Sequence, residues 1–169
     1  MEEILVLVKD KNSYNQTKIS KMGFETVKAL LAFPAAKAFP ALDLYRMLLM
    51  HPSMMEPFKH SDSAVDILGS LLSHLRNGPA PTQMMALRCL VNMFKNNSSF
   101  QLLTNQLKGV LDTVAPKLCS DNKNVRQSAL TLMLNCSMIM IDSKHSQGRQ
   151  HLIELVQPAC IFETDCKNY

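Results

Sequence analysis

The 169-residue sequence is poor in aromatic and flexible residues, with no tryptophan, 3 tyrosines and 5 glycines. Scarce aromatic residues disfavour a β-sandwich, and they also disfavour a surface that stacks nucleobases. The glycines are scattered along the chain, so none of them builds a glycine-rich loop that cradles phosphate groups. The abundant leucines and 12 methionines favour a helical protein instead.

The sequence also has no apolar run that would suit a membrane or export. The longest such run near the start, residues 4–8, is too short to span a bilayer, and Glu2 and Glu3 before it have the wrong charge for a secretory signal. The five cysteines are an odd set without C-x-x-C spacing, which fits reduced thiols. We therefore expect no membrane insertion, and a location in the cytoplasm or the nucleus.

Signs of catalysis and of metal binding are equally sparse. No nucleophile, base and orienting group stand out together, and the five histidines share no metal-ligand spacing with each other or with cysteine. We expect no enzyme activity, no metal and no cofactor. The 18 basic and 14 acidic residues give a net charge of +4, which permits an acidic partner. Because no basic run is present, nucleic acid is not expected as a partner.

Apolar residues recur with helical spacing from residue 24 onward and predict an all-α chain. Turns that contain proline, such as Phe33-Pro34, His51-Pro52 and Asn77-Gly78-Pro79, separate the helices. The predicted helices cover about 24–31, 41–50, 65–75, 82–95, 99–107, 109–118, 124–141 and 147–156. We expect an N-terminal helix and linker over 1–22, one domain over 23–157 and a polar tail over 158–169.

An Ala-Leu pair recurs inside three of the predicted long helices. The pairs begin at Ala41, Ala86 and Ala129, at spacings of 45 and 43 residues. This period is typical of armadillo and HEAT repeats, whose units must stack to bury their apolar faces. The pattern predicts an armadillo/HEAT-like α-solenoid superhelix with about three repeats and partial ends.

Aligning the units by this alanine reveals polar residues on a shared helical face. Asn92 and Asn135 each lie six residues after the alanine, and Arg88 and Thr131 lie one turn before them. The asparagines could bridge neighbouring helices inside the solenoid. Alternatively, resemblance to armadillo repeats implies that they line a concave groove, where an amide matches the main chain of an extended peptide.

Three stretches carry a family resemblance: FPALDLYR with the following HPS (residues 39–46 and 51–53), MMALRCLVNMF (84–94) and DNKNVRQSALTLMLNCS (121–137). Over about residues 24–157 the sequence resembles a PUL domain, which is armadillo-like. The resemblance implies a non-catalytic adaptor that binds the acidic C-terminal tail of valosin-containing protein, an AAA+ ATPase of ubiquitin-dependent protein turnover. Other ubiquitin-pathway proteins are further candidate partners.

The resemblance carries over Arg88, Asn92 and Asn135 as peptide-binding residues. Thr131 is added because it lies on the same helical face, and the basic residues Lys95, Lys123 and Arg126 are added from their charge and helical phase. We expect Arg88 and Lys95 to pair with carboxylates, and the asparagines to hold the main chain of the peptide. Asp43 and Arg46, three residues apart, are expected to form a local helix pair.

The chain also departs from the family, because a full PUL domain has further helices after the predicted helix at 147–156. We therefore expect a shortened domain. Two other functions stay open: a scaffold for a different peptide or for ubiquitin, and a region that accompanies a thiol hydrolase domain outside this chain.

Overall fold

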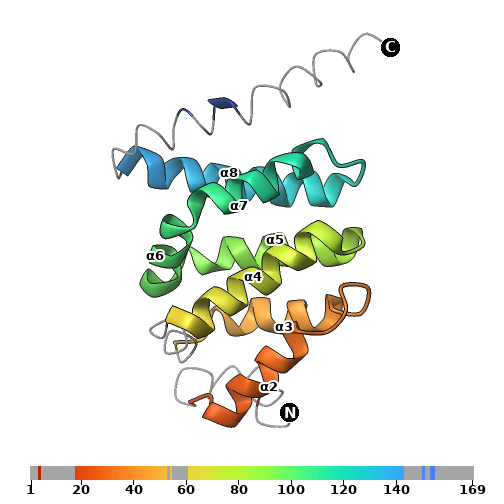
Figure 1. The fold of residues 1–169 in the computed structure, drawn as a ribbon, viewed down its shortest axis with the longest axis vertical. Helices are drawn as coiled ribbons and strands as arrows, with labels where there is room; N and C mark the ends of the chain where they lie inside the picture. The colour runs from red at the N-terminus through yellow and green to blue at the C-terminus, as the bar shows by residue number, and fades with distance from the viewer. Residues whose placement is uncertain are drawn as a thin grey trace.

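The computed structural model describes residues 18–52 and 61–142, together with residues 4, 54, 150, 153 and 154. Within these residues all regular structure is helical, which confirms the all-α prediction (Figure 1). The predicted N-terminal helix and the predicted helix at 147–156 lie mostly outside the described residues. The helices are α2 (Lys21–Leu31), α3 (Phe39–Leu48), α4 (Ser61–Asn77), α5 (Ala80–Met93), α6 (Asn97–Asn105), α7 (Leu107–Val114), the 3₁₀ helix η2 (Ala115–Cys119) and α8 (Lys123–Asp142).

The helices stack in two layers, as an α-solenoid requires. Figure 1 shows α3, α5 and α8 one above another, with α4 and α7 forming a second layer in front of them. Helix α5 packs against both α3 and α8, while α4 packs against α5 and α7. Helix α5 therefore buries its apolar side chains against the long helices of both neighbouring units as well as against α4.

Polar side chains fix several helix starts. The Ser20 hydroxyl accepts from the Gly23 N–H at 3.0 Å before α2, and Asn96 Oδ1 accepts from the N–H groups of Ser98 and Ser99 before α6. Asn122 caps α8 in the same way. These bonds satisfy N–H groups that have no partner inside their own helix, and so they set where each helix begins.

The repeated alanines lie where the long helices pack closely. Ala41, Ala86 and Ala129 are all buried, which fits their shared position in the repeat. The leucine that follows each alanine is buried in the first two units but not in the last. Leu42 and Leu87 are 0% exposed, whereas Leu130 is 54% exposed. The outer face of α8, which carries Leu130, Leu134 and Met138, is thus open in the described part of the chain.

Three side chains of α5 donate hydrogen bonds to main-chain carbonyls of the preceding unit. Thr82 Oγ1 donates to Ala35 O at 2.9 Å, Cys89 Sγ to Leu42 O at 3.3 Å, and Asn92 Nδ2 to Arg46 O at 2.8 Å. The donors and acceptors are 46 or 47 residues apart, close to one repeat. The bridging interpretation therefore holds for Asn92.

Candidate functional site

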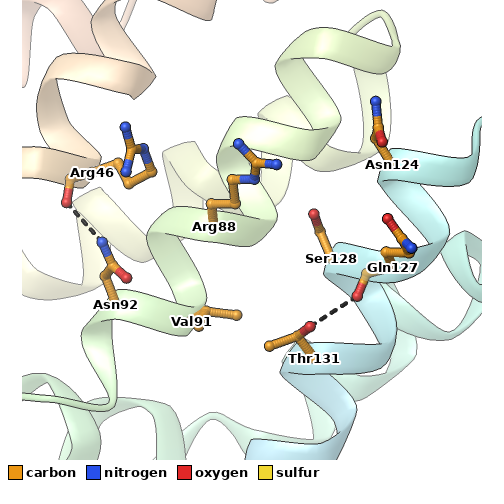
Figure 2. A pocket seen from close by; sticks show the side chains of 8 residues that line it. All are labelled: Arg46, Arg88, Val91, Asn92, Asn124, Gln127, Ser128 and Thr131. Atoms are coloured by element: carbon orange, nitrogen blue, oxygen red, sulfur yellow. Dashed lines mark hydrogen bonds between the residues drawn. The ribbon is translucent and has the colours of Figure 1, made fainter.

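A pocket of about 380 Å³ opens where α3, α5 and α8 meet, and we call it the central pocket (Figure 2). Its walls come from the C-terminal part of α3, the second half of α5 and the first three turns of α8. Most of its lining side chains are polar: Arg46, Arg88, Val91, Asn92, Asn124, Gln127, Ser128 and Thr131.

Two guanidinium groups give the central pocket its charge. Arg46 is oriented by Asp43, whose Oδ1 accepts from Arg46 Nε at 3.0 Å and from Nη2 at 2.7 Å, as the sequence spacing predicted. Arg88 is an exposed residue that extends from α5 towards the pocket (Figure 2). No acidic residue is among the lining side chains, so the pocket is electropositive even though Asp43 offsets part of the Arg46 charge.

The other polar groups keep free hydrogen-bonding capacity. Asn92 donates through Nδ2 to Arg46 O, and among the described residues no donor is bound to its Oδ1, which can therefore accept from a ligand. The Thr131 hydroxyl donates to Gln127 O at 2.9 Å, so towards a ligand it can only accept. Asn124 and Gln127 are exposed at the start of α8 and each offers both a donor and an acceptor.

The structure brings together three of the predicted binding residues, since Arg88, Asn92 and Thr131 all line the central pocket. The other predicted residues are not among its lining. Lys95 is exposed in the turn after α5, and Asn135 is half-buried one turn beyond Thr131.

Two basic residues near the start of α8 also lie outside the pocket lining. Lys123 is exposed at the first position of the helix. Arg126 Nη1 donates to Ser120 O at 2.6 Å and to Asp121 O at 3.0 Å. These bonds hold the turn that leads into α8, and this gives Arg126 a structural role.

Sequence reasoning missed five of the lining residues. A signal for them was present, because Asn124, Gln127 and Ser128 precede Thr131 at helical spacings, and Val91 lies three residues after Arg88. Arg46 was assigned only to its pair with Asp43. It lies one position before Met47, the residue that matches the asparagines of the other units.

The buried thiols are unsuited to nucleophilic chemistry. Burial holds the pKa of the Cys89 thiol well above its ordinary value and raises that of Cys136 to about 12. Both side chains are therefore neutral, poorly reactive parts of the core. Among the described residues, no group of three or more His, Cys, Asp or Glu is placed to hold a metal ion. Within the same residues, no helix is long and apolar enough to cross a membrane.

Comparison with known proteins decides the family, because the sequence model of the PUL domain matches residues 1–161. The chain belongs to the PUL domain family. It is 24% identical over 139 residues to phospholipase A-2-activating protein from Xenopus laevis, covering 82% of this chain and 17% of that protein. It is also 24% identical over 144 residues to the ubiquitin fusion degradation protein 3 homolog from Caenorhabditis elegans, covering 83% and 16%. The chain thus spans about a sixth of the length of these relatives.

Proposed function

We propose that this PUL domain is a protein-interaction module whose central pocket holds an extended acidic peptide, the C-terminal tail of the AAA+ ATPase valosin-containing protein. The observation that carries the proposal is the lining of the pocket: two guanidinium groups and several amides and hydroxyls, with no carboxylate. The name of one relative points to ubiquitin-dependent degradation, and we place this module in the same process.

The lining can recognise both the side chains and the backbone of such a peptide. Arg46 and Arg88 would each donate to a carboxylate, and Asp43 keeps the Arg46 guanidinium in place for that contact. Asn92 Oδ1 and the Thr131 hydroxyl would accept main-chain N–H groups, while Asn124 and Gln127 on the opposite wall would donate to main-chain carbonyls.

The expected affinity follows from the charge-assisted bonds. Each hydrogen bond between an arginine and a carboxylate contributes roughly 1.5–3 kcal/mol net. Two such bonds contribute roughly 3–6 kcal/mol, and the main-chain hydrogen bonds and the partial burial of Val91 offset the cost of association, so we expect a dissociation constant no tighter than roughly 1 μM, or about −8 kcal/mol. Salt should weaken the complex, since both guanidinium groups are partly exposed to solvent.

Fluorescence anisotropy with a labelled peptide of the ATPase tail tests the proposal. We expect Arg88→Gln and Arg46→Gln each to weaken binding by about 10-fold or more, corresponding to about 1.4 kcal/mol. Lys37→Gln is the matched control, because it removes the same charge from an exposed turn between α2 and α3 that does not line the pocket.

The possible outcomes test separately whether the central pocket is the binding site and whether the ATPase tail is the peptide that binds there. If all three variants weaken binding equally, net charge rather than the central pocket holds the peptide. If the wild-type chain is helical by circular dichroism and binds no tail peptide, the proposed partner is wrong. A peptide with its acidic residues replaced by amides should bind at least 10-fold more weakly.

A further inference from the structure

A second pocket lies in the other helix layer, away from the central pocket. It has a volume of about 500 Å³ and is lined by α4, α7 and η2, through Arg76, Gly109, Asp112, Thr113, Pro116 and Lys117. None of these residues lines the central pocket, which is built from α3, α5 and α8. Figure 1 shows α4 and α7 together in the front layer.

A chain of hydrogen bonds holds the Arg76 side chain at this pocket. Arg76 Nη2 donates to Thr113 Oγ1 at 3.1 Å, and the Thr113 hydroxyl donates to Gly109 O at 2.8 Å. Because its single proton is used on Gly109, the hydroxyl can only accept from the guanidinium. Among the described residues, Thr113 is the one hydrogen-bond partner of the Arg76 guanidinium, so its other N–H groups can donate to a ligand.

Lys117 supplies a second positive charge, for which the described part of the chain offers no counter-ion. Its side chain is half-buried, and burial alone lowers its pKa. Among the described residues, no carboxylate lies within ion-pair distance of its ammonium group. Asp112 also lines the pocket, but its carboxylate is paired with Lys108 at 2.8 Å. A partly desolvated cation without a partner favours binding of an anion.

The open space beside Gly109 makes the pocket accessible. A Cβ atom added at this glycine would meet no other heavy atom within 4 Å. The missing side chain therefore leaves room for a ligand between α7 and the side chains of Arg76 and Lys117.

We propose that the second pocket binds a single carboxylate, carried by an acidic side chain of a protein partner. Arg76 and Lys117 would contact the two carboxylate oxygens, and the glycine surface would accommodate the side chain that bears them. The Asp112 carboxylate in the lining would repel a doubly charged phosphate monoester more strongly than a singly charged carboxylate, which favours the carboxylate. The site would give a partner of the module a second attachment point, independent of the central pocket.

Nuclear magnetic resonance of the full chain tests the proposal, with the Gly109 amide as the reporter. The probes are the tripeptide acetyl-Gly-Glu-Gly-amide and its neutral counterpart acetyl-Gly-Gln-Gly-amide. We expect the glutamate probe to shift the Gly109 signal in the millimolar range, and the glutamine probe to leave it in place. Arg76→Gln and Lys117→Gln should each weaken this binding at least fivefold, while Lys37→Gln should leave it unchanged.

A space-filling variant adds an independent check. Gly109→Leu should fold, since its Cβ is unhindered, and should abolish binding by occupying the pocket. The proposal would be overturned if the glutamate and glutamine probes shifted the Gly109 signal equally. It would also be overturned if Arg76→Gln, Lys117→Gln and Lys37→Gln weakened binding equally, or if Gly109→Leu bound the glutamate probe as tightly as the wild type. A phosphoserine probe that binds more tightly than the glutamate probe would overturn the choice of a carboxylate. Arg88→Gln should not affect this assay, so the second pocket and the central pocket are tested separately.

Discussion

The side-chain amide of Asn92 donates to the main-chain carbonyl of Arg46 at 2.8 Å, which joins the two units at the point where the central pocket begins. Arg46 lies in the last turn of α3, and at this end the Met50 N–H bonds to Met47 O instead. Asn92 thus supplies a partner for a carbonyl at the end of a helix, where carbonyls lack partners within the helix. The same residue both lines the pocket and stabilises its wall.

Asn92→Ala should therefore affect stability as well as binding. We expect the free energy of unfolding to fall by about 1–3 kcal/mol, because the carbonyl of Arg46 is left without its donor. Urea denaturation followed by circular dichroism measures this change. Arg88→Gln, which changes an exposed side chain of the same pocket, should shift the free energy of unfolding by less than about 0.5 kcal/mol. An unchanged stability of Asn92→Ala would contradict the bridging role.

Asp43→Asn should strengthen binding of an acidic peptide in the central pocket. The Asp43–Arg46 pair is about one-third exposed, at 37% and 32%, so its orienting effect is worth only about 0–1 kcal/mol. Removing the carboxylate adds a net positive charge beside the pocket. We expect affinity to rise about threefold at low salt and the gain to vanish at high salt, as charge screening requires. Weaker binding by the variant would instead show that orientation of Arg46 by Asp43 dominates.

Gly78→Ala and Gly69→Ala form a matched pair with opposite expected effects. A Cβ at Gly78 would lie 2.6 Å from the main-chain oxygen of His74 and 2.7 Å from the Thr82 side chain, so the turn between α4 and α5 must shift. A Cβ at Gly69, inside α4, meets nothing within 4 Å. Thermal unfolding should show Gly69→Ala stabilised by up to about 1 kcal/mol, and Gly78→Ala destabilised.

Stability should fall in alkaline solution because of the buried thiols. Burial raises the pKa of Cys136 from 9.0 to about 12, so above about pH 9 the unfolded chain loses this proton while the folded chain keeps it. The unfolded state is then favoured by about 1 kcal/mol for each pH unit and each such thiol. Burial also raises the pKa of Cys89, so this thiol lowers stability over the same pH range. Burial raises the pKa of Tyr45 as well, and its hydroxyl lowers stability at higher pH. In urea denaturation at about pH 8 and about pH 10, Cys136→Ala should lose less stability than the wild type.

Leu87→Lys and Leu130→Lys test the repeat register. The two leucines hold equivalent positions, but Leu87 is fully buried and Leu130 is 54% exposed. A lysine at the first position must bury a charge, so we expect loss of several kcal/mol and of the folded state. At the second position the free energy of unfolding should change by less than about 0.5 kcal/mol. Equal destabilisation would mean that the outer face of α8 is covered in the folded chain.

The sequence allowed the helices and the repeat to be predicted because small and apolar side chains recur at fixed positions. Arg88, Asn92 and Thr131 were found from the same recurrence, and all three line the central pocket. Helical spacing gives the face of one helix, but it does not give the offset at which two helices stack. Since the first turns of α8, rather than its middle, lie beside Arg88, the pocket includes Asn124 and Gln127 instead of Asn135.

Local hydrogen bonds and ion pairs explain why the roles predicted for two arginines differ from those in the structure. Arg126 has the charge and the position for a binding residue, but its guanidinium is engaged with the carbonyls of Ser120 and Asp121. No sequence pattern distinguishes an arginine that holds a turn from one that faces a ligand. Arg46 shows the opposite error. The sequence predicted only its local pair with Asp43, whereas in the structure Arg46 also lines the central pocket.

The three bonds from Thr82, Cys89 and Asn92 make the junctions on the two sides of α5 mechanically different. Towards α3, directional bonds to fixed carbonyls resist both sliding and rotation. Towards α8, helix α5 is held by extensive packing, and no side-chain hydrogen bond joins the two helices among the described residues. The central pocket spans both junctions, so a directional bond between Asn92 and Arg46 fixes one of its walls, whereas helix packing positions the wall that α8 provides.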